Sequence, residues 1–132
     1  MKSAQLVYSI LCDDVRLEMG NKLSLMGVFE NVYLPSFPAV LWRFAAVNHW
    51  IGAGDYQTQV RVVSPDGRDV AQSAPSTLRV EPEGYADNVT FFANVGLERA
   101  GRYSIQTFMD GKMVSERPLF VGLIQQPPST VN

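Results

Sequence analysis

Apolar and polar residues alternate along most of this chain, in short runs separated by turn residues. In the run 88–97, Val89, Phe91 and Ala93 alternate with Asn88 and Thr90. A period of two places one face of a strand in the core and the other in water. Helical periodicity is absent, apart from one short turn expected at 13–19. The predicted strands are 5–13, 23–33, 41–50, 56–63, 69–72, 76–80, 88–97, 102–109 and 113–121.

Glycine-containing dipeptides punctuate these runs. Asp110-Gly111 separates the last two predicted strands, Asp66-Gly67 follows the run 56–63, and Gly20-Asn21 separates two runs near the N-terminus. Such pairs tolerate the positive φ angles of tight hairpins. We therefore expect antiparallel hairpins, with Asp110 and Gly111 setting the register of the last one.

A glycine followed two residues later by a tyrosine opens the penultimate strand, at Gly101 and Tyr103. This spacing resembles the tyrosine corner of immunoglobulin-like sandwiches, in which the hydroxyl bonds to backbone a few residues upstream. The Cys–Trp–Cys pattern of antibody domains is absent. The sequence thus predicts an all-β, immunoglobulin-like antiparallel β-sandwich of about eight strands.

The composition indicates one ordered domain. The chain has 132 residues, of which 46% are hydrophobic and 18% charged, an ordinary globular balance with few charges. We expect a single domain at 1–124 and a flexible tail at 125–132 that contains Pro127 and Pro128. The low charge leaves less polar cover for the surface, which favours a partner or self-association.

Charge and cysteine content exclude several classes of function. The net charge is −2 and the basic residues are scattered, which argues against nucleic-acid binding. No apolar run reaches the roughly 18 residues of a membrane span. Gln5 and Ser9 interrupt the apolar stretch that a signal peptide needs. Cys12 is the only cysteine, and its alternation with Tyr8 and Ile10 predicts an inert core thiol. We expect a cytoplasmic protein with neither nucleic acid nor membrane as a partner.

His49 is the only histidine, so any histidine-dependent catalysis must use it. The Gly-x-Ser-x-Gly sequence of a hydrolase nucleophile is absent, and we expect His49 to lie at a strand end as an ordinary polar residue. One histidine and one cysteine are too few ligands for a transition metal. We predict no catalytic residue, cofactor or metal site, and retain a hydrolase using His49 as the weaker alternative.

Four carboxylates flank the first predicted hairpin: Asp13, Asp14, Glu18 and Glu30. Carboxylates grouped in this way bind hard cations such as calcium. The spacing matches no calcium-binding loop, and Arg16 and Lys22 lie close enough in sequence to pair with them. Solvated turn residues are the favoured interpretation, and the cation alternative stays open.

The tryptophans give the strongest candidate for a ligand surface. Trp42, Phe44, Asn48 and Trp50 share a parity, and hence one face, of a predicted strand. If that face is internal, it forms core. If it is exposed, Trp42, Asn48, His49 and Trp50 form an aromatic platform for a sugar ring or a protein. Asn48 within the set favours partial exposure.

The strand edges favour self-association. The predicted strands 69–72 and 76–80 are short, and Pro75 and Pro82 each precede or follow one of them, as expected of a protected edge. The opposite edge, which we assign to the N-terminal or C-terminal strand, lacks such breakers until Pro127. We therefore expect a homodimer in which the terminal strands contribute to the contact.

Three segments resemble a known family. They are Leu11-Cys12-Asp13-Asp14-Val15-Arg16, then residues 20–29 (GNKLSLMGVF), then Leu34-Pro35-Ser36-Phe37-Pro38. Together they are similar to short bacterial proteins known only as a domain of unknown function. The resemblance is clearest in the N-terminal third and implies a small stand-alone β-sandwich. It implies no activity.

These observations favour a non-catalytic binding or assembly module. The alternative is a carbohydrate-binding module that uses Trp42 and Trp50 on an aromatic face. Exposure of both tryptophans would favour the carbohydrate-binding module over the binding or assembly module.

Overall fold

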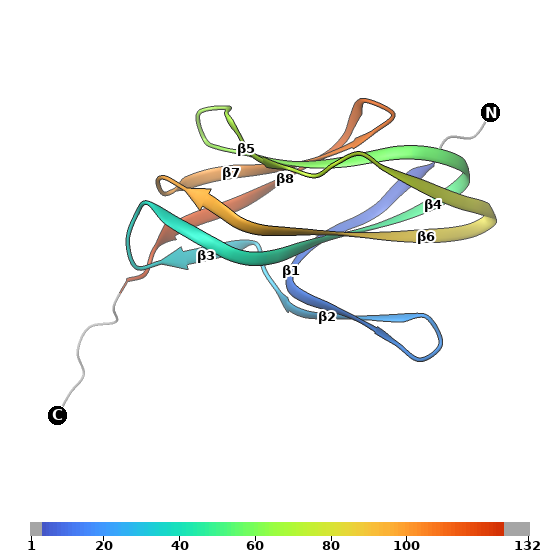
Figure 1. Cartoon of the computed structure of the whole chain (residues 1–132), viewed down its shortest axis with the longest axis horizontal. Helices are drawn as coiled ribbons and strands as arrows, with labels where there is room; N and C mark the ends of the chain where they lie inside the picture. The colour runs from blue at the N-terminus through green and yellow to red at the C-terminus, as the bar shows by residue number, and fades with distance from the viewer. Residues whose placement is uncertain (1–3, 126–132) are drawn as a thin grey trace.

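The computed structural model describes residues 4–125, and they form an all-β domain. The strands belong to one curled, mixed sheet that forms a half-barrel (Figure 1). Their bounds are β1 Gln5–Glu18, β2 Lys22–Val28, β3 Asn31–Leu34, β4 Ala39–Val63, β5 Asp69–Gln72, β6 Ser76–Leu97, β7 Gly101–Met109 and β8 Lys112–Leu123.

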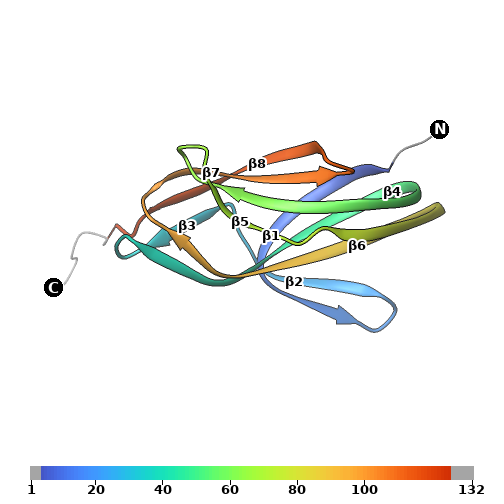
Figure 2. The ribbon, with the colours of Figure 1, turned by 45° about the horizontal axis from the view of Figure 1, so that its top comes forward.

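Two strands are much longer than the sequence predicts. β4 joins the predicted strands 41–50 and 56–63, and β6 joins 76–80 and 88–97. Gly52 and Gly54, with φ of 123° and 121°, lie where the register of β4 against β6 shifts. Both strands bend in this region, and the bend curls the sheet (Figure 2). Gly52-Ala53-Gly54 is therefore a bend inside a strand rather than a turn between strands.

The sheet order is β2-β1-β4-β7-β8-β3, with β5 and β6 also paired to β4. All pairings are antiparallel except β3 with β8, where Asn31 lies opposite Phe120 in a parallel ladder. The expected purely antiparallel sheet is therefore wrong, since β3 enters the sheet beside a strand that runs in the same direction. The eight strands and the all-β class are confirmed, and the immunoglobulin-like sandwich stays a prediction.

The predicted turn residues adopt left-handed backbone conformations. Asp110 and Gly111 have φ of 49° and 80° and form a two-residue loop between the paired Met109 and Lys112. The Asp110 carboxylate also accepts a hydrogen bond from the backbone N–H of Gln57 at 2.9 Å. The Asp-Gly pair therefore sets the register of β7 and β8 and ties their hairpin to β4.

Tyr103 makes the hydrogen bond that the sequence led us to expect. Its side chain is buried at the start of β7, and its hydroxyl donates to the Arg99 carbonyl at 2.8 Å. Gly101 precedes it with φ of 149°, and a Cβ there would come within 2.7 Å of Pro65. A glycine at this position thus allows the chain to approach Pro65 before Tyr103 enters the core.

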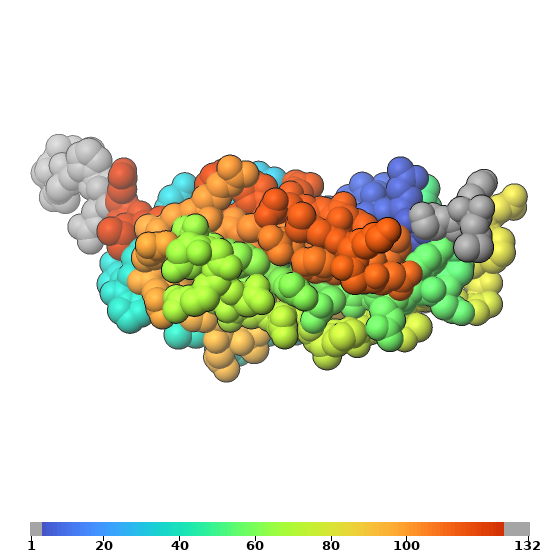
Figure 3. Space-filling model, turned by 90° about the horizontal axis from the view of Figure 1, so that it is seen from above, coloured from blue at the N-terminus to red at the C-terminus, as the bar shows by residue number. Residues whose placement is uncertain are grey.

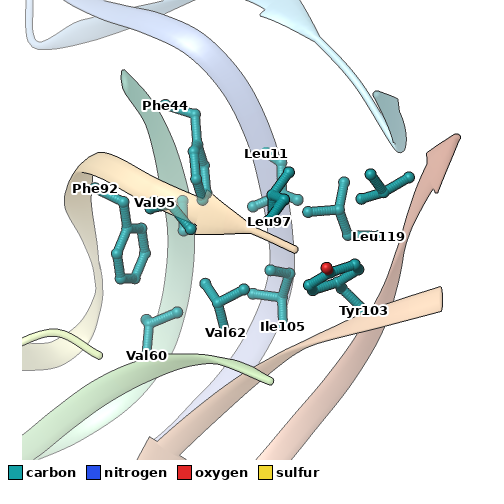
Figure 4. Close-up of a cluster of buried hydrophobic side chains, with 12 residues drawn as sticks. Leu11, Phe44, Val60, Val62, Phe92, Val95, Leu97, Tyr103, Ile105 and Leu119 are labelled. Atoms are coloured by element: carbon teal, nitrogen blue, oxygen red, sulfur yellow. The ribbon is translucent and has the colours of Figure 1, made fainter. Parts of the chain in front are cut away.

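The main core fills the inside of the half-barrel (Figure 4). It combines aliphatic and aromatic side chains from β1, β4, β6, β7 and β8. Phe44 and Phe92 stack within it, with ring centroids 5.2 Å apart. Its buried members are Leu11, Phe44, Ala46, Val60, Val62, Phe92, Val95, Leu97, Tyr103, Ile105, Leu119 and Val121.

A smaller cluster lies under the β1–β2 hairpin. Cys12, Ala45 and Val47 are fully buried there, with Leu23 and Leu25 of β2 packed against them. Burial, followed by the charges of Asp13 and Asp14, raises the pKa of the Cys12 thiol, which keeps it protonated and unreactive. The short helical turn expected at 13–19 is instead the end of β1 paired with β2.

The expected tail at 125–132 falls almost wholly outside the described residues, which end at Gln125. Within residues 4–125, no helix is long and apolar enough to cross a membrane.

Candidate binding surface

The proposed aromatic platform does not form, because its two tryptophans lie on different sides of the sheet. The Trp42 side chain is 76% exposed, whereas Trp50 is fully buried. Residues three apart lie on opposite faces of a regular strand, yet Leu41 and Phe44 both face the main core. The pleat is therefore interrupted between them, opposite Asn94, which has a left-handed φ of 54°.

Asn48 is also buried, which corrects the expectation of partial exposure. It lies on the inner side of β4 with Trp50, whose indole N–H donates to Asn88 Oδ1 at 3.0 Å. Asn88 Nδ2 donates in turn to the Thr58 hydroxyl at 2.7 Å. Both polar atoms of the Asn48 amide lack a hydrogen-bond partner among the described residues. Trp50 and Asn48 thus belong to the interior and not to a ligand platform.

His49 is the one member of the predicted set that lies at a partly exposed polar cluster. It sits inside β4 rather than at a strand end, with Tyr8 of β1 directly opposite on one side and Asp87 of β6 on the other. Its Nδ1 lies 2.5 Å from Asp87 Oδ1, and both side chains are about one-fifth exposed. Three neighbouring strands therefore bring Tyr8, His49 and Asp87 into one row.

Two tyrosine rings flank the imidazole. Tyr8 stacks on His49 with centroids 4.8 Å apart and planes within 5°, and Tyr85 lies 5.1 Å away at 33°. Burial raises the pKa of the Tyr8 hydroxyl, and the nearby Asp87 and Tyr85 raise it further. The Tyr85 side chain is 56% exposed. We call Tyr8, His49, Tyr85 and Asp87 the tyrosine–histidine cluster.

The Asp87 carboxylate determines what His49 can do chemically. A carboxylate only accepts hydrogen bonds, so Nδ1 of His49 carries a proton, and Nε2 is an acceptor whenever the ring is neutral. This is the base half of a catalytic triad. Among the described residues, however, no serine, threonine or cysteine side chain bonds to His49, and Cys12 lies in the cluster under the β1–β2 hairpin.

The four N-terminal carboxylates do not converge. Asp14 pairs with Arg43 at 3.5 Å and Glu30 with Arg117 at 3.4 Å, while Glu18 lies opposite Lys22 in the hairpin. The Asp13 carboxyl packs over Gly27, where a Cβ would meet it at 2.2 Å. Within residues 4–125, no three histidine, cysteine or acidic side chains are grouped to hold a metal.

A cavity of about 310 Å³ lies at the end of the sheet where β5 begins and β6 ends. Four of its five charged side chains are paired with each other. Arg68 bonds to Glu98 at 2.9 Å, and Arg99 lies 3.9 Å from Asp66. The hydrogen bond from the Ser64 hydroxyl is the main reason that the pKa of Asp66 is lowered. The cavity therefore presents charges that are mostly paired within its own lining.

Two strand edges without a partner strand lie on the other side of the half-barrel. Residues 5–11 of β1 pair only with β4, and residues 112–119 of β8 pair only with β7. A cavity of about 70 Å³ separates them, lined by Ser9 and Leu11 on one side and by Arg117 and Pro118 on the other. Figure 3 shows the blue start of β1 beside the orange β7–β8 hairpin.

Sequence reasoning missed Tyr8, Tyr85 and Asp87. A bulge between Leu6 and Tyr8 puts these two residues on opposite faces, so Leu6 packs with Trp50 while Tyr8 stacks on His49. Asp87 lies 38 residues from His49, and only the register of β4 against β6 brings them together. One signal for this cluster was available in the sequence: alternation puts His49 on the face of the strand opposite to Ala46 and Asn48.

A comparison with curated proteins finds no match. The sequence does match a family described as Family of unknown function (DUF6941), over residues 7–122. This range includes all eight strands, at least in part, and every residue of the tyrosine–histidine cluster. The chain belongs to the Family of unknown function (DUF6941).

Proposed function

We propose that this protein is a non-catalytic binding module that assembles as a homodimer through the free edge of β1. The observation that carries this proposal is the stretch Gln5 to Ile10, which pairs with β4 on one side and with no strand on the other. A free edge exposes a row of backbone donors and acceptors, which another strand can pair with. Antiparallel pairing of β1 with its copy gives the self-complementary contact of a two-fold dimer.

The composition of this edge supports the proposal. Residues 5–10 contain no charged residue and no proline, the two devices that usually prevent edge pairing. Val7 is 51% exposed there, and Met113 and Val114 are exposed on the neighbouring edge of β8. The β8 edge itself carries Lys112, two further charges and Pro118, so β1 is the better edge for pairing.

Two finer assignments accompany this proposal. The half-barrel is of the immunoglobulin-like sandwich class, a view that the Tyr103–Arg99 hydrogen bond supports. The protein acts in the cytoplasm, a view that rests on its single buried cysteine.

The mass of the protein in solution tests the dimer. Light scattering at micromolar concentration should give about twice the 14.6 kDa of the chain. Val7→Lys should give the monomer mass, because it places a charge on the edge. Val40→Lys is the matched control, since Val40 is equally exposed but lies on β4 at the far end of the sheet, and it should stay dimeric. A monomer at high concentration would contradict the proposal.

The His49–Asp87 pair is the one observation that favours the alternative, a hydrolase. A catalytic imidazole needs a nucleophile within hydrogen-bond reach, and the described hydrogen bonds supply none. We expect that any turnover found in a broad hydrolase screen survives His49→Ala. Loss of that turnover in a folded His49→Ala variant would favour the enzyme.

A further inference from the structure

We propose that the tyrosine–histidine cluster is a recognition site for the guanidinium group of an arginine side chain on a protein partner. The cluster lies on the outer face of β1, β4 and β6, whereas the proposed dimer uses the edge of β1. Edge pairing leaves the faces of a sheet free. The site therefore goes beyond the dimer and does not depend on it.

The first argument is charge. Asp87 is four-fifths covered, and His49 is the one side chain among the described residues that bonds to its carboxylate; a neutral imidazole leaves the negative charge of that carboxylate uncompensated. A covered carboxylate is costly unless a cation or several donors satisfy it. Five of the eight arginines pair with other carboxylates: Arg43 with Asp14, Arg68 with Glu98, Arg79 with Asp55 and Glu81, Arg99 with Asp66, and Arg117 with Glu30. A cation on a protein partner would therefore neutralise the Asp87 carboxylate.

The second argument is the direction of the hydrogen bonds. Nδ1 of His49 donates its hydrogen bond to Asp87, so the neutral ring keeps Nε2 as an acceptor, and the His49 side chain is about one-fifth exposed. The second oxygen of Asp87 and the two tyrosine hydroxyls are further acceptors. Burial, followed by the charges of Asp87 and Tyr85, raises the pKa of the Tyr8 hydroxyl, so this hydroxyl stays protonated. A guanidinium carries five N–H donors and no acceptor, so it matches this set.

The third argument is shape. A guanidinium is planar and stacks on aromatic rings, which a lysine ammonium does less well. The Tyr85 ring is more than half exposed and stands beside Asp87. This chain makes the same contact internally, with Arg43 4.5 Å from the centroid of Phe91 and Arg61 4.4 Å from that of Phe108. A sugar would use the ring but has no need of the carboxylate's charge.

The test is a titration of the full chain with N-acetyl-arginine amide, followed by the ¹⁵N resonances of the His49 ring. We expect a saturable shift of Nε2. Asp87→Asn should raise the Kd about tenfold, since it removes a charge-assisted contact. The matched control is Asp55→Asn, because Asp55 is an exposed carboxylate paired with Arg79, and we expect less than about a twofold change.

A second variant covers a failure of Asp87→Asn to fold. Tyr85→Ala truncates an exposed ring and should also raise the Kd severalfold while the chain stays folded. N-acetyl-lysine amide should bind more weakly than the arginine probe, and methyl β-glucoside should leave the His49 resonances unchanged. No saturable shift with the arginine probe, equal binding by folded Asp87→Asn, or a shift with the glucoside alone would each overturn the proposal. Repeating the titration with Val7→Lys separates this result from the state of the dimer.

Discussion

Two free strand edges of the half-barrel, one along β6 and one along the first half of β1, are built differently. β6 pairs only with β4 over its whole length. Its free edge contains Pro82, and both Glu83 and Asn94 take a left-handed φ, of 59° and 54°. β1 has a bulge between Leu6 and Tyr8 but neither a proline nor a left-handed residue in 5–10.

This difference shows where the chain resists strand addition and where it does not. A proline removes a backbone donor, and a left-handed residue turns the neighbouring groups away from a regular ladder. The β6 edge therefore cannot form a long, regular pairing with another strand. The β1 edge has one bulge but neither proline nor left-handed residue in 5–10, so it keeps more of its backbone donors and acceptors available for pairing, which is the physical basis of the proposed dimer.

The largest expected effect tests the hairpin that holds the edge of β8 beside β1. Gly111→Val places a β-branched residue at φ of 80° and should destabilise the fold by roughly 2 kcal/mol or more. Nothing lies within 4 Å of a Cβ at this position, so the loss comes from the backbone alone. Gly111→Asn is the control, because asparagine tolerates this conformation. Equal melting temperatures for the two variants would refute the assigned turn.

The next effect concerns Tyr103, which anchors β7, the strand that pairs with β8. Tyr103→Phe leaves the Arg99 carbonyl without its partner and should destabilise by about 1–2 kcal/mol. The exposed Tyr33 serves as the comparison, and Tyr33→Phe should change stability by less than about 0.5 kcal/mol. Chemical denaturation of both variants gives the two values. An unchanged midpoint for Tyr103→Phe would remove the tyrosine-corner assignment.

The smallest effect tests the interruption of the β6 edge. Glu83→Gly relieves a left-handed φ at an exposed position and should stabilise the fold by up to about 1 kcal/mol, after the entropy of glycine is deducted. Asn94→Gly should gain less, because asparagine already tolerates this conformation. Thermal unfolding measures both. A destabilised Glu83→Gly would show that the interruption at Pro82 and Glu83 has another cause.

Much of the fold follows from local sequence, and the exceptions have a common cause. Alternation and the turn at Asp110-Gly111 predict the β7–β8 hairpin, and three of its four strand ends agree with the structure to within one residue. The sequence does not show that β4 and β6 run on through their bends, because Gly52-Ala53-Gly54 and Pro82-Glu83-Gly84 are typical of turns. Whether such a segment ends a strand or bends it depends on pairing with a distant strand.

The site was less accessible from the sequence than the fold. His49 and its place beside buried residues follow from alternation, but its neighbours Tyr8, Tyr85 and Asp87 depend on the register of three strands. The loss of Trp50 from the predicted platform has a similar origin. A strict period of two puts Trp42 and Trp50 on one face, and the interrupted pleat beside Asn94 separates them.

Hydrogen exchange at two protein concentrations tests the contrast between the edges most directly. On dilution from a concentrated to a dilute solution, peptides covering residues 5–11 should exchange faster, because the proposed dimer protects the amides on that edge. Peptides covering residues 81–97 of β6 should exchange at the same rate at both concentrations. Exchange in residues 5–11 that does not depend on concentration, or protection that appears along β6 instead, would contradict the account.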